Sequence, residues 1–184
     1  MSSHLPDVQL IEPRRHADER GWFTESYSEA AFAARGIGER FVQDNHSLSR
    51  PAFTLRGLHF QTAPAAQSKL VRCLRGRVWD VIVDMREGSP THGRSQGFDL
   101  SAENGRQLYV PVGFAHGFLT LEPDCEVAYK VSSPYSAAHD SGISWNDPAL
   151  GIDWPLPAGV SPLVSAKDAA LPTLAEYENK QVVA

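Results

Sequence analysis

The sequence predicts an all-β fold, either a sandwich or a barrel, on the strength of two observations. Turn-forming residues recur about every 8–12 positions between Val8 and Tyr135, which is the usual spacing of short strands in such folds. Only one segment has the composition of a helix, whereas the stretches between turns are rich in valine, leucine, isoleucine and aromatic residues. Helices are therefore expected to be few and short.

The first predicted element is a helix over residues 28–35, which read SEAAFAAR. Ser28 is a favourable N-cap, the alanines favour helix, and Gly36 is a common terminating residue. Further along, residues 69–85 consist of two apolar runs separated near Gly76, which predicts two strands joined by a turn.

Two more strand pairs follow this segment. Residues 98–110 contain apolar stretches on either side of an Asn-Gly pair at 104–105. Asn-Gly favours a type I′ turn, because that turn needs positive φ at both central residues, so the segment predicts a β-hairpin. The stretches 118–122 and 125–131 flank a Pro-Asp pair and predict two further strands.

The composition changes after Ser136, where proline and glycine become frequent and no periodicity remains. Trp145 and Trp154 are costly to leave in water, so we expect this segment to wrap back over the sandwich as ordered loops. Residues 172–184 are expected to end in a short helix and a loose tail. The length predicts one domain over residues 1–184, with a sandwich core over about 8–135.

Charge and composition exclude several classes of protein. The 184 residues carry 17 Lys and Arg against 22 Asp and Glu, a net charge of −5 without a basic block, which argues against nucleic-acid binding. No apolar run reaches about 18 residues and no signal-peptide pattern is present, so a cytoplasmic protein without membrane contact is expected. Cys73 and Cys125 form no CxxC motif and are expected to be free thiols.

Two of the seven histidines have unusual sequence surroundings. His59 lies in a strand pattern two positions after a glycine, and His116 lies beside a glycine in an aromatic stretch. Small β-barrels can bind a metal through such histidines, but the position two after His59 is Gln61 and the next glutamate is Glu87. Because Zn, Fe and Mn sites need about three converging His or carboxylate ligands, we expect no metal.

Metal-free acid–base chemistry is the second interpretation of these residues. A histidine becomes an effective general base when a carboxylate orients its ring, and Asp168 is a candidate partner for His59. Tyr129 could serve as an opposing acid, and Lys69 could stabilise developing negative charge. Taken singly, these residues favour the simpler interpretation of a buried histidine, a strand aromatic and a solvated lysine.

Eight segments between Val8 and Leu174, taken together, favour a functional role for these residues. They are DERGWFTESY at 18–27, VQDNHSLS at 42–49, TLRGLHFQ at 54–61, QSKLVRCLRGRVWDVIVDMREGSPTHG at 67–93, LYVPVGFAHGFL at 108–119, YKVSSPYS at 129–136, GISWNDPALGIDWPL at 142–156 and VSAKD at 164–168. In this order and with these gaps, the chain resembles the dTDP-4-dehydrorhamnose 3,5-epimerase family of nucleotide-sugar epimerases.

The resemblance implies a cupin-type jelly roll of two antiparallel sheets that acts without metal or other cofactor. It also implies a homodimer with exchanged N-terminal strands, in which a segment of one subunit completes the site of its partner. The implied substrate is dTDP-4-dehydro-6-deoxy-D-glucose. Inversion at C3 and C5 converts it to dTDP-4-dehydro-L-rhamnose, a precursor for lipopolysaccharide or another cell-surface polysaccharide.

The same resemblance implies the catalytic roles. His59 would remove a proton next to the C4 ketone, and Asp168 would orient its ring. Lys69 would lie at the C4 oxygen, where a cation stabilises the enolate. Tyr129 would deliver the new proton from the opposite face, which inversion requires because return from the same face restores the starting configuration.

Binding residues carry over by position as well. Arg20 and Arg56 would contact the diphosphate and sugar, since a guanidinium suits phosphate oxygens. Asp140 stands where the family usually has the longer Glu, and Tyr135 retains an aromatic near the sugar that favours inversion at both carbons. The other matched positions are Phe23, Glu25, Gln43, Asn45, Lys69, His116 and Lys167.

The sequence leaves two related functions open. An epimerase that inverts only C3 or only C5 of a related dTDP-4-keto-deoxysugar would share these motifs. So would a protein that binds a sugar nucleotide on a cupin scaffold without turning it over.

Overall fold

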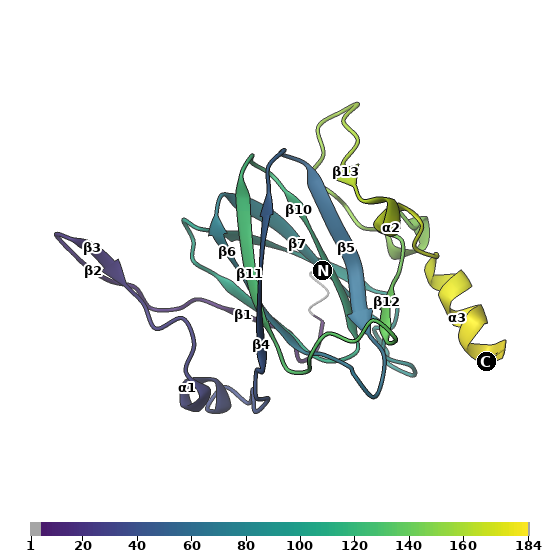
Figure 1. Ribbon diagram of the computed structural model, residues 1–184, viewed down its shortest axis with the longest axis horizontal. Coiled ribbons are helices and arrows are strands. Elements are labelled where there is room, and N and C mark those ends of the chain that lie inside the picture. The colour runs from purple at the N-terminus through teal and green to yellow at the C-terminus, as the bar shows by residue number, and fades with distance from the viewer. Residues whose placement is uncertain (1–4, 184) are drawn as a thin grey trace.

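The computed structural model describes residues 5–183, so the predicted domain limits at Met1 and Ala184 lie outside the described residues. Two sheets form a sandwich (Figure 1). The first sheet has the order β1 (Gln9–Ile11), β9 (Gln107–Val110), β6 (Lys69–Arg75), β11 (Cys125–Val131), β4 (Gln43–Ser49). The second has the order β12 (Asp140–Gly142), β5 (Thr54–Gln61), β10 (Phe114–Thr120), β7 (Arg77–Asp84), β8 (Ser95–Ser101).

Both sheets are antiparallel along these orders, and the short strand β13 (Leu163–Val164) adds to β5 in parallel. The fold is thus the predicted jelly roll, mostly β with a few short helices. The helices are α1 (Glu29–Ala33), the 3-10 turn η1 (Pro148–Leu150), α2 (Ala166–Ala169) and α3 (Leu174–Val183). No helix within residues 5–183 is long and apolar enough to cross a membrane.

The predicted helix at 28–35 is confirmed as α1. The Ser28 hydroxyl accepts from the Ala31 N–H at 3.4 Å, and Gly36 adopts a positive φ of 83° just after the helix. The α1 region covers part of the outer face of the first sheet, where Phe32 packs in a cluster with Leu70 and Tyr109.

The main core lies between the two sheets. Val71 and Val127 from the first sheet contact a buried cluster that includes Ile82 and Phe114 from the second. Alternate residues of each strand supply this layer because successive side chains of a strand point to opposite faces. Cys73 and Cys125 lie in this core as free thiols, as predicted.

The prediction of a hairpin at the Asn-Gly pair is wrong, because β8 and β9 belong to different sheets. Gly105 has a positive φ of 63° but Asn104 does not. Instead, the Asn104 side-chain oxygen accepts the N–H groups of Ser101 at 3.1 Å and Arg106 at 2.9 Å, which stabilises a different turn. The turns after β6 and β10 likewise cross between the sheets, so β5, β6, β10 and β11 surround one interior space.

The C-terminal segment packs against the outer face of the second sheet. Trp154 joins a cluster containing Leu58 and Phe60 of β5, and its ring N–H donates to the Trp145 carbonyl at 2.9 Å. Tyr177 of α3 meets the Phe60 ring edge-on at 5.4 Å. This wrapping brings α2 against β5.

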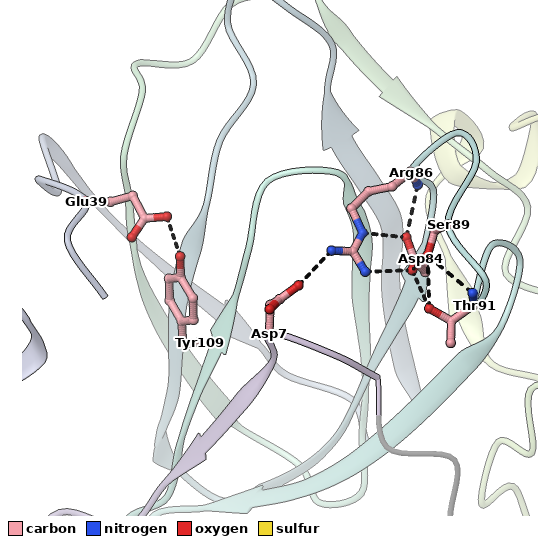
Figure 2. A network of polar contacts seen from close by, with 7 residues as sticks. All are labelled: Asp7, Glu39, Asp84, Arg86, Ser89, Thr91 and Tyr109. Carbon is pink, nitrogen blue, oxygen red and sulfur yellow. Dashed lines mark hydrogen bonds and ion pairs between the residues drawn. The ribbon is translucent and has the colours of Figure 1, made fainter. Parts of the chain in front are cut away.

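A buried carboxylate fixes the end of β7 (Figure 2). Asp84 accepts hydrogen bonds from Arg86 at 2.8 Å, Ser89 at 2.7 Å and Thr91 at 2.6 Å. Burial opposes ionisation of Asp84, but these bonds outweigh it and hold its pKa well below the usual range. Arg86 also pairs with Asp7 at 2.9 Å, which ties the segment before β1 to the sandwich.

Candidate active site

Two cavities lie between the sheets and share three lining residues, His59, Lys69 and Tyr129. The larger cavity has a volume of about 540 Å³ and the smaller about 210 Å³. Among the residues predicted from the sequence, the larger cavity is also lined by Arg56, His116 and Asp168, and the smaller by Gln43, Asn45, Tyr135, Asp140 and Lys167.

His59 and Asp168 form a hydrogen-bonded pair. The ring Nε2 of His59, on β5, lies 2.8 Å from Asp168 Oδ1, on α2. The second carboxylate oxygen accepts the Gly57 N–H at 3.2 Å, and the Ser165 hydroxyl accepts the Asp168 N–H at 3.0 Å. Because Nε2 faces the carboxylate, Nδ1 is the ring nitrogen left for a ligand.

Asp168 remains ionised at neutral pH. Burial alone would raise its pKa, but the hydrogen bond and charge of His59, with the Gly57 and Ser165 bonds, lower the pKa below its usual value. A fixed carboxylate of this kind orients an imidazole ring and stabilises its protonated form. The pair is therefore arranged as a general base.

Gly57 permits the close approach that builds this pair. Its φ is +124°, and a Cβ placed there would lie 2.6 Å from Gly117 Cα and 2.9 Å from the His116 carbonyl oxygen. Only glycine fits such a position, where two strand backbones nearly touch. The approach of β5 to β10 leaves the Gly57 N–H free to bind Asp168.

Lys69 is a buried cation at the junction of the two cavities. It is 8 % exposed, and its ammonium donates to the His59 carbonyl oxygen at 3.2 Å. Burial lowers the Lys69 pKa to about 8, although the negative charges of Asp80 and Asp140 oppose this change. An ammonium with few protein partners can stabilise an oxyanion placed in either cavity.

Tyr129 faces the same space from the other sheet, on β11. Burial raises the pKa of its hydroxyl, with Asp140 adding to the effect and Arg56 opposing it, so the phenol keeps its proton at neutral pH. Within the described chain no side chain or backbone group hydrogen-bonds this hydroxyl. Tyr129 can therefore donate a proton to a ligand on the side opposite β5.

The Lys69 environment predicts a pH limit. If the charged ammonium is needed, kcat/KM falls as the pH rises through about 8, because deprotonation removes the cation. Tyr129 cannot cause this limb, since its pKa is raised above its ordinary value near 10. A steady-state pH profile checks this, and a kcat/KM that stays constant up to pH 10 would contradict it.

Arg56 and His116 of the larger cavity are held in fixed orientations. Arg56 donates to the Ser49 hydroxyl at 3.1 Å and to the Leu48 carbonyl at 3.2 Å. His116 Nε2 lies 2.9 Å from Asp80 Oδ2, and both residues are buried. Within the part of the chain that the structure describes, the second Asp80 oxygen has no hydrogen-bond partner, and the negative charge of Asp80 acts to raise the pKa of Lys69.

A second carboxylate organises the smaller cavity. Asp140 accepts hydrogen bonds from the Tyr135 hydroxyl at 3.1 Å and from the Lys167 ammonium. Its hydrogen bond raises the pKa of Lys167. Gln43 donates to the side-chain oxygen of Asn45 at 2.8 Å. Although aspartate is shorter than glutamate, Asp140 thus bonds both Tyr135 and Lys167 directly.

Three predicted residues do not lie at these cavities within one chain. Arg20 and Phe23 belong to the hairpin of β2 (His16–Asp18) and β3 (Gly21–Phe23), which projects away from the sandwich, and Glu25 follows it (Figure 1). Arg20 pairs with Asp18 at 2.5 Å, and Phe23 is 70 % exposed. Among the described residues the hairpin strands pair only with each other, and Trp22 of β3 lines a separate small cavity together with Arg72 and Leu74 of β6.

Sequence reasoning missed other residues of the site. Asp80 is an acid inside the apolar run RVWDVIVD, and that interruption is the sequence feature that could have revealed a buried charge. Gln61 and Gln67 line the smaller cavity, but no feature of the sequence distinguishes them from ordinary polar residues. Within residues 5–183 no group of three or more His, Cys, Asp or Glu side chains is placed to hold a metal.

Comparison with known proteins gives consistent matches. The family model described as dTDP-4-dehydrorhamnose 3,5-epimerase matches residues 2–176. The chain is 51% identical to the Sinorhizobium fredii dTDP-4-dehydrorhamnose 3,5-epimerase, covering 95% of this chain and 89% of that protein.

Two solved structures are also similar. The Bacillus anthracis enzyme of that name, with TDP and PPi bound, has a TM-score of 0.88 at 53% identity, covering 91% and 94% of the two chains. The Legionella pneumophila dTDP-6-deoxy-D-glucose-3,5-epimerase, in complex with dTDP-4-keto-L-rhamnose, has a TM-score of 0.90 at 44% identity, covering 97% and 93%.

Proposed function

The chain belongs to the dTDP-4-dehydrorhamnose 3,5-epimerase family and is a carbohydrate epimerase of dTDP-rhamnose biosynthesis, and from this premise we propose how its own residues carry out the reaction. The observation that supports the proposal most directly is that His59 and Tyr129 line the same cavities from opposite sheets. A base and an acid on two sides of a sugar ring are what inversion requires.

The first step is removal of a proton from C3 or C5 of the sugar. Both carbons adjoin the C4 ketone, which makes their protons acidic. Nδ1 of His59 takes the proton, the electrons of the C–H bond form a carbon–carbon double bond, and the electrons of the C=O bond move to the oxygen. The Lys69 ammonium stabilises the enolate, and Asp168 stabilises the imidazolium.

The second step returns a proton from the other face. The enolate electrons form a new C–H bond with the Tyr129 hydroxyl proton, and the C4 ketone is restored. Exchange with solvent removes the proton from His59 and returns one to Tyr129. A shift or turn of the sugar then brings the second carbon between the same two residues.

The diphosphate and the sugar bind in different parts of the site. Arg56 and His116 at the larger cavity suit the phosphate oxygens, since one terminal guanidinium nitrogen of Arg56 has no partner among residues 5–183. Asp140 and Lys167 at the smaller cavity offer an acceptor and a donor for sugar oxygens. With the diphosphate in the larger cavity and the sugar oxygens at the smaller one, the sugar ring lies where the two cavities meet, beside Lys69.

Deuterium exchange tests the proposed function. In D2O, dTDP-4-dehydro-6-deoxy-D-glucose is expected to acquire deuterium at both C3 and C5 as it is converted to the L-rhamno product, which NMR of the sugar protons resolves. Deuterium at only one carbon would show a single-site epimerase. Binding of dTDP without exchange at either carbon would show a non-catalytic nucleotide-sugar protein.

The projecting arm supports a dimer. We propose that Arg20, Phe23 and Glu25 enter the larger cavity of a second copy of the chain, where the arginine meets the diphosphate and the aromatic ring meets the thymine base. Phe23 is 70 % exposed on a hairpin whose strands pair only with each other in the described part of the chain, and such an exposed aromatic ring is costly in water unless a partner covers it. Exchange of such an element between identical subunits is a common route to a dimer.

Mixing of two inactive variants tests the exchange. In a mixed dimer of His59→Ala and Arg20→Ala chains, one site has a normal His59 and receives a normal arm from the partner. After unfolding and refolding an equal mixture, activity is expected to rise to about a quarter of the wild-type value, because about half of the dimers are mixed and each has one intact site. Activity that stays at the level of the separate variants would contradict arm exchange.

A further inference from the structure

The loop between β11 and β12 is held by three glutamine side chains, which we call the glutamine cradle: Gln43, Gln61 and Gln67. They come from β4, from β5 and from the segment just before β6, and all three line the smaller cavity. Glutamines from such distant parts of the sequence therefore meet at one short loop. That loop carries Tyr135, whose ring also lines the smaller cavity.

The cradle binds the loop through its backbone. Gln67 donates to the Ser133 carbonyl at 2.6 Å, and Gln61 donates to the Pro134 carbonyl at 3.2 Å. The Tyr135 N–H donates to the Gln43 side-chain oxygen at 3.2 Å, and the Ser136 N–H donates to the Gln61 side-chain oxygen at 2.7 Å. Each of the four consecutive residues 133–136 is thus fixed by one of these amides.

Gln61 is the central member of the cradle. It is 7 % exposed, and its amide nitrogen also donates to the Ala65 carbonyl at 2.6 Å. Both ends of the amide are used, so a rotation that exchanged its oxygen and nitrogen would break all three bonds. Gln61 stands two positions after His59 on β5, so it joins the strand of the base to the loop of Tyr135.

Tyr135 depends on this support because the hydrophobic core does not hold it. The residue is 59 % exposed, and its hydroxyl donates to Asp140 at 3.1 Å. Its backbone is fixed by the cradle and its tip by Asp140, so the ring forms a rigid wall of the smaller cavity. A wall that was free to move would leave the sugar without a defined position there.

We propose that Gln61 and Gln67 are positioning residues that fix the Tyr135 wall and thereby determine which carbons of the sugar reach His59 and Tyr129. The inference rests on the proposed function, in which one acid–base pair serves both C3 and C5. C3 and C5 lie on either side of C4. A displacement of the Tyr135 wall therefore shifts the sugar so that one of these carbons moves toward His59 and Tyr129 and the other moves away. A misplacement of about 1 Å can lower a rate about 100-fold, which makes the two inversions unequal.

The test is Gln61→Met and Gln67→Met, which keep the approximate shape and remove the hydrogen bonds. Deuterium incorporation at C3 and C5 is measured in D2O for each variant, together with the dissociation constant for dTDP. The matched control is Gln96→Met on β8, because Gln96 also accepts a backbone N–H, from Leu5 at 2.9 Å, but lies at the far edge of the second sheet.

In Gln61→Met, the ratio of the two exchange rates is expected to change by at least about tenfold, with dTDP affinity within about twofold of wild type. Gln67→Met, which removes one bond from a less buried residue, is expected to change the ratio in the same direction even if Gln61→Met fails to fold. The Gln96→Met ratio should equal that of wild type.

Equal slowing at both carbons, or an unchanged ratio in Gln67→Met, would overturn the positioning role. A wild-type protein that exchanges at only one carbon would instead contradict the proposed function, so the two failures are distinguishable.

Discussion

Replacement of His59 by alanine is expected to lower kcat about 10³–10⁴-fold and to abolish deuterium exchange at both C3 and C5, with dTDP affinity changed less than about threefold. In the proposed mechanism the imidazole is the base for both protons, whereas residues elsewhere in the larger cavity bind the diphosphate. A rate loss of about 10³-fold corresponds to about 4 kcal/mol of transition-state stabilisation.

Tyr129→Phe should lose as much epimerisation as His59→Ala but behave differently in D2O. Without the acid on the far face, His59 still removes the proton and returns deuterium to the face it came from. The substrate therefore gains deuterium without inversion, which NMR distinguishes from product formation.

His46→Ala provides the control for these variants. His46 is exposed on β4 and pairs with Glu126 at 3.0 Å, away from the two cavities, so its loss should leave kcat unchanged. Exchange that persists in His59→Ala would remove His59 from the role of base. If Tyr129→Phe loses deuterium exchange as well as inversion, the proposal that the two residues act on opposite faces is contradicted.

The sequence predicted the strands well because strand formation here follows local pattern and turn chemistry. It predicted one pairing wrongly, because the choice of partner is a property of the whole sandwich. The Asn-Gly pair at 104–105 is compatible with a hairpin, but the Asn104 side chain caps a different turn and the chain crosses to the other sheet. Local residues specify that a turn occurs, but they do not specify which sheet the following strand joins.

In the site, too, local sequence predicts some features and the tertiary structure sets others. Residues matched by motif, such as His59 and Lys69, line the same two cavities. The distance between His59 and Asp168 depends on the parallel pairing of β13 with β5, which no local pattern encodes. Gln61 and Gln67 of the glutamine cradle were not predicted as site residues, because glutamine is common on protein surfaces and only burial and hydrogen bonding distinguish Gln61.

Asp168→Asn is expected to lower kcat roughly 10³-fold, because it changes which nitrogen of His59 carries the proton. In the wild-type protein the carboxylate accepts a hydrogen bond from the Nε2–H at 2.8 Å, which leaves Nδ1 free to accept the substrate proton. Asparagine can still accept the Gly57 N–H through its oxygen, and its NH2 group then points at Nε2. Nε2 must become the acceptor, so Nδ1 carries the proton and cannot act as a base.

This tautomer change is directly measurable. The ¹⁵N chemical shifts of His59 are expected to show the proton on Nε2 in the wild type and on Nδ1 in Asp168→Asn. The affinity for dTDP is expected to stay within about threefold of the wild-type value. Asp99→Asn is the control, because Asp99 pairs with Arg77 on the far edge of the second sheet and should leave kcat unchanged. An unchanged kcat in Asp168→Asn would refute the orienting role. If kcat falls while the proton stays on Nε2, the loss comes from the missing negative charge. The role of Asp168 would then be to stabilise the imidazolium and not to set the tautomer.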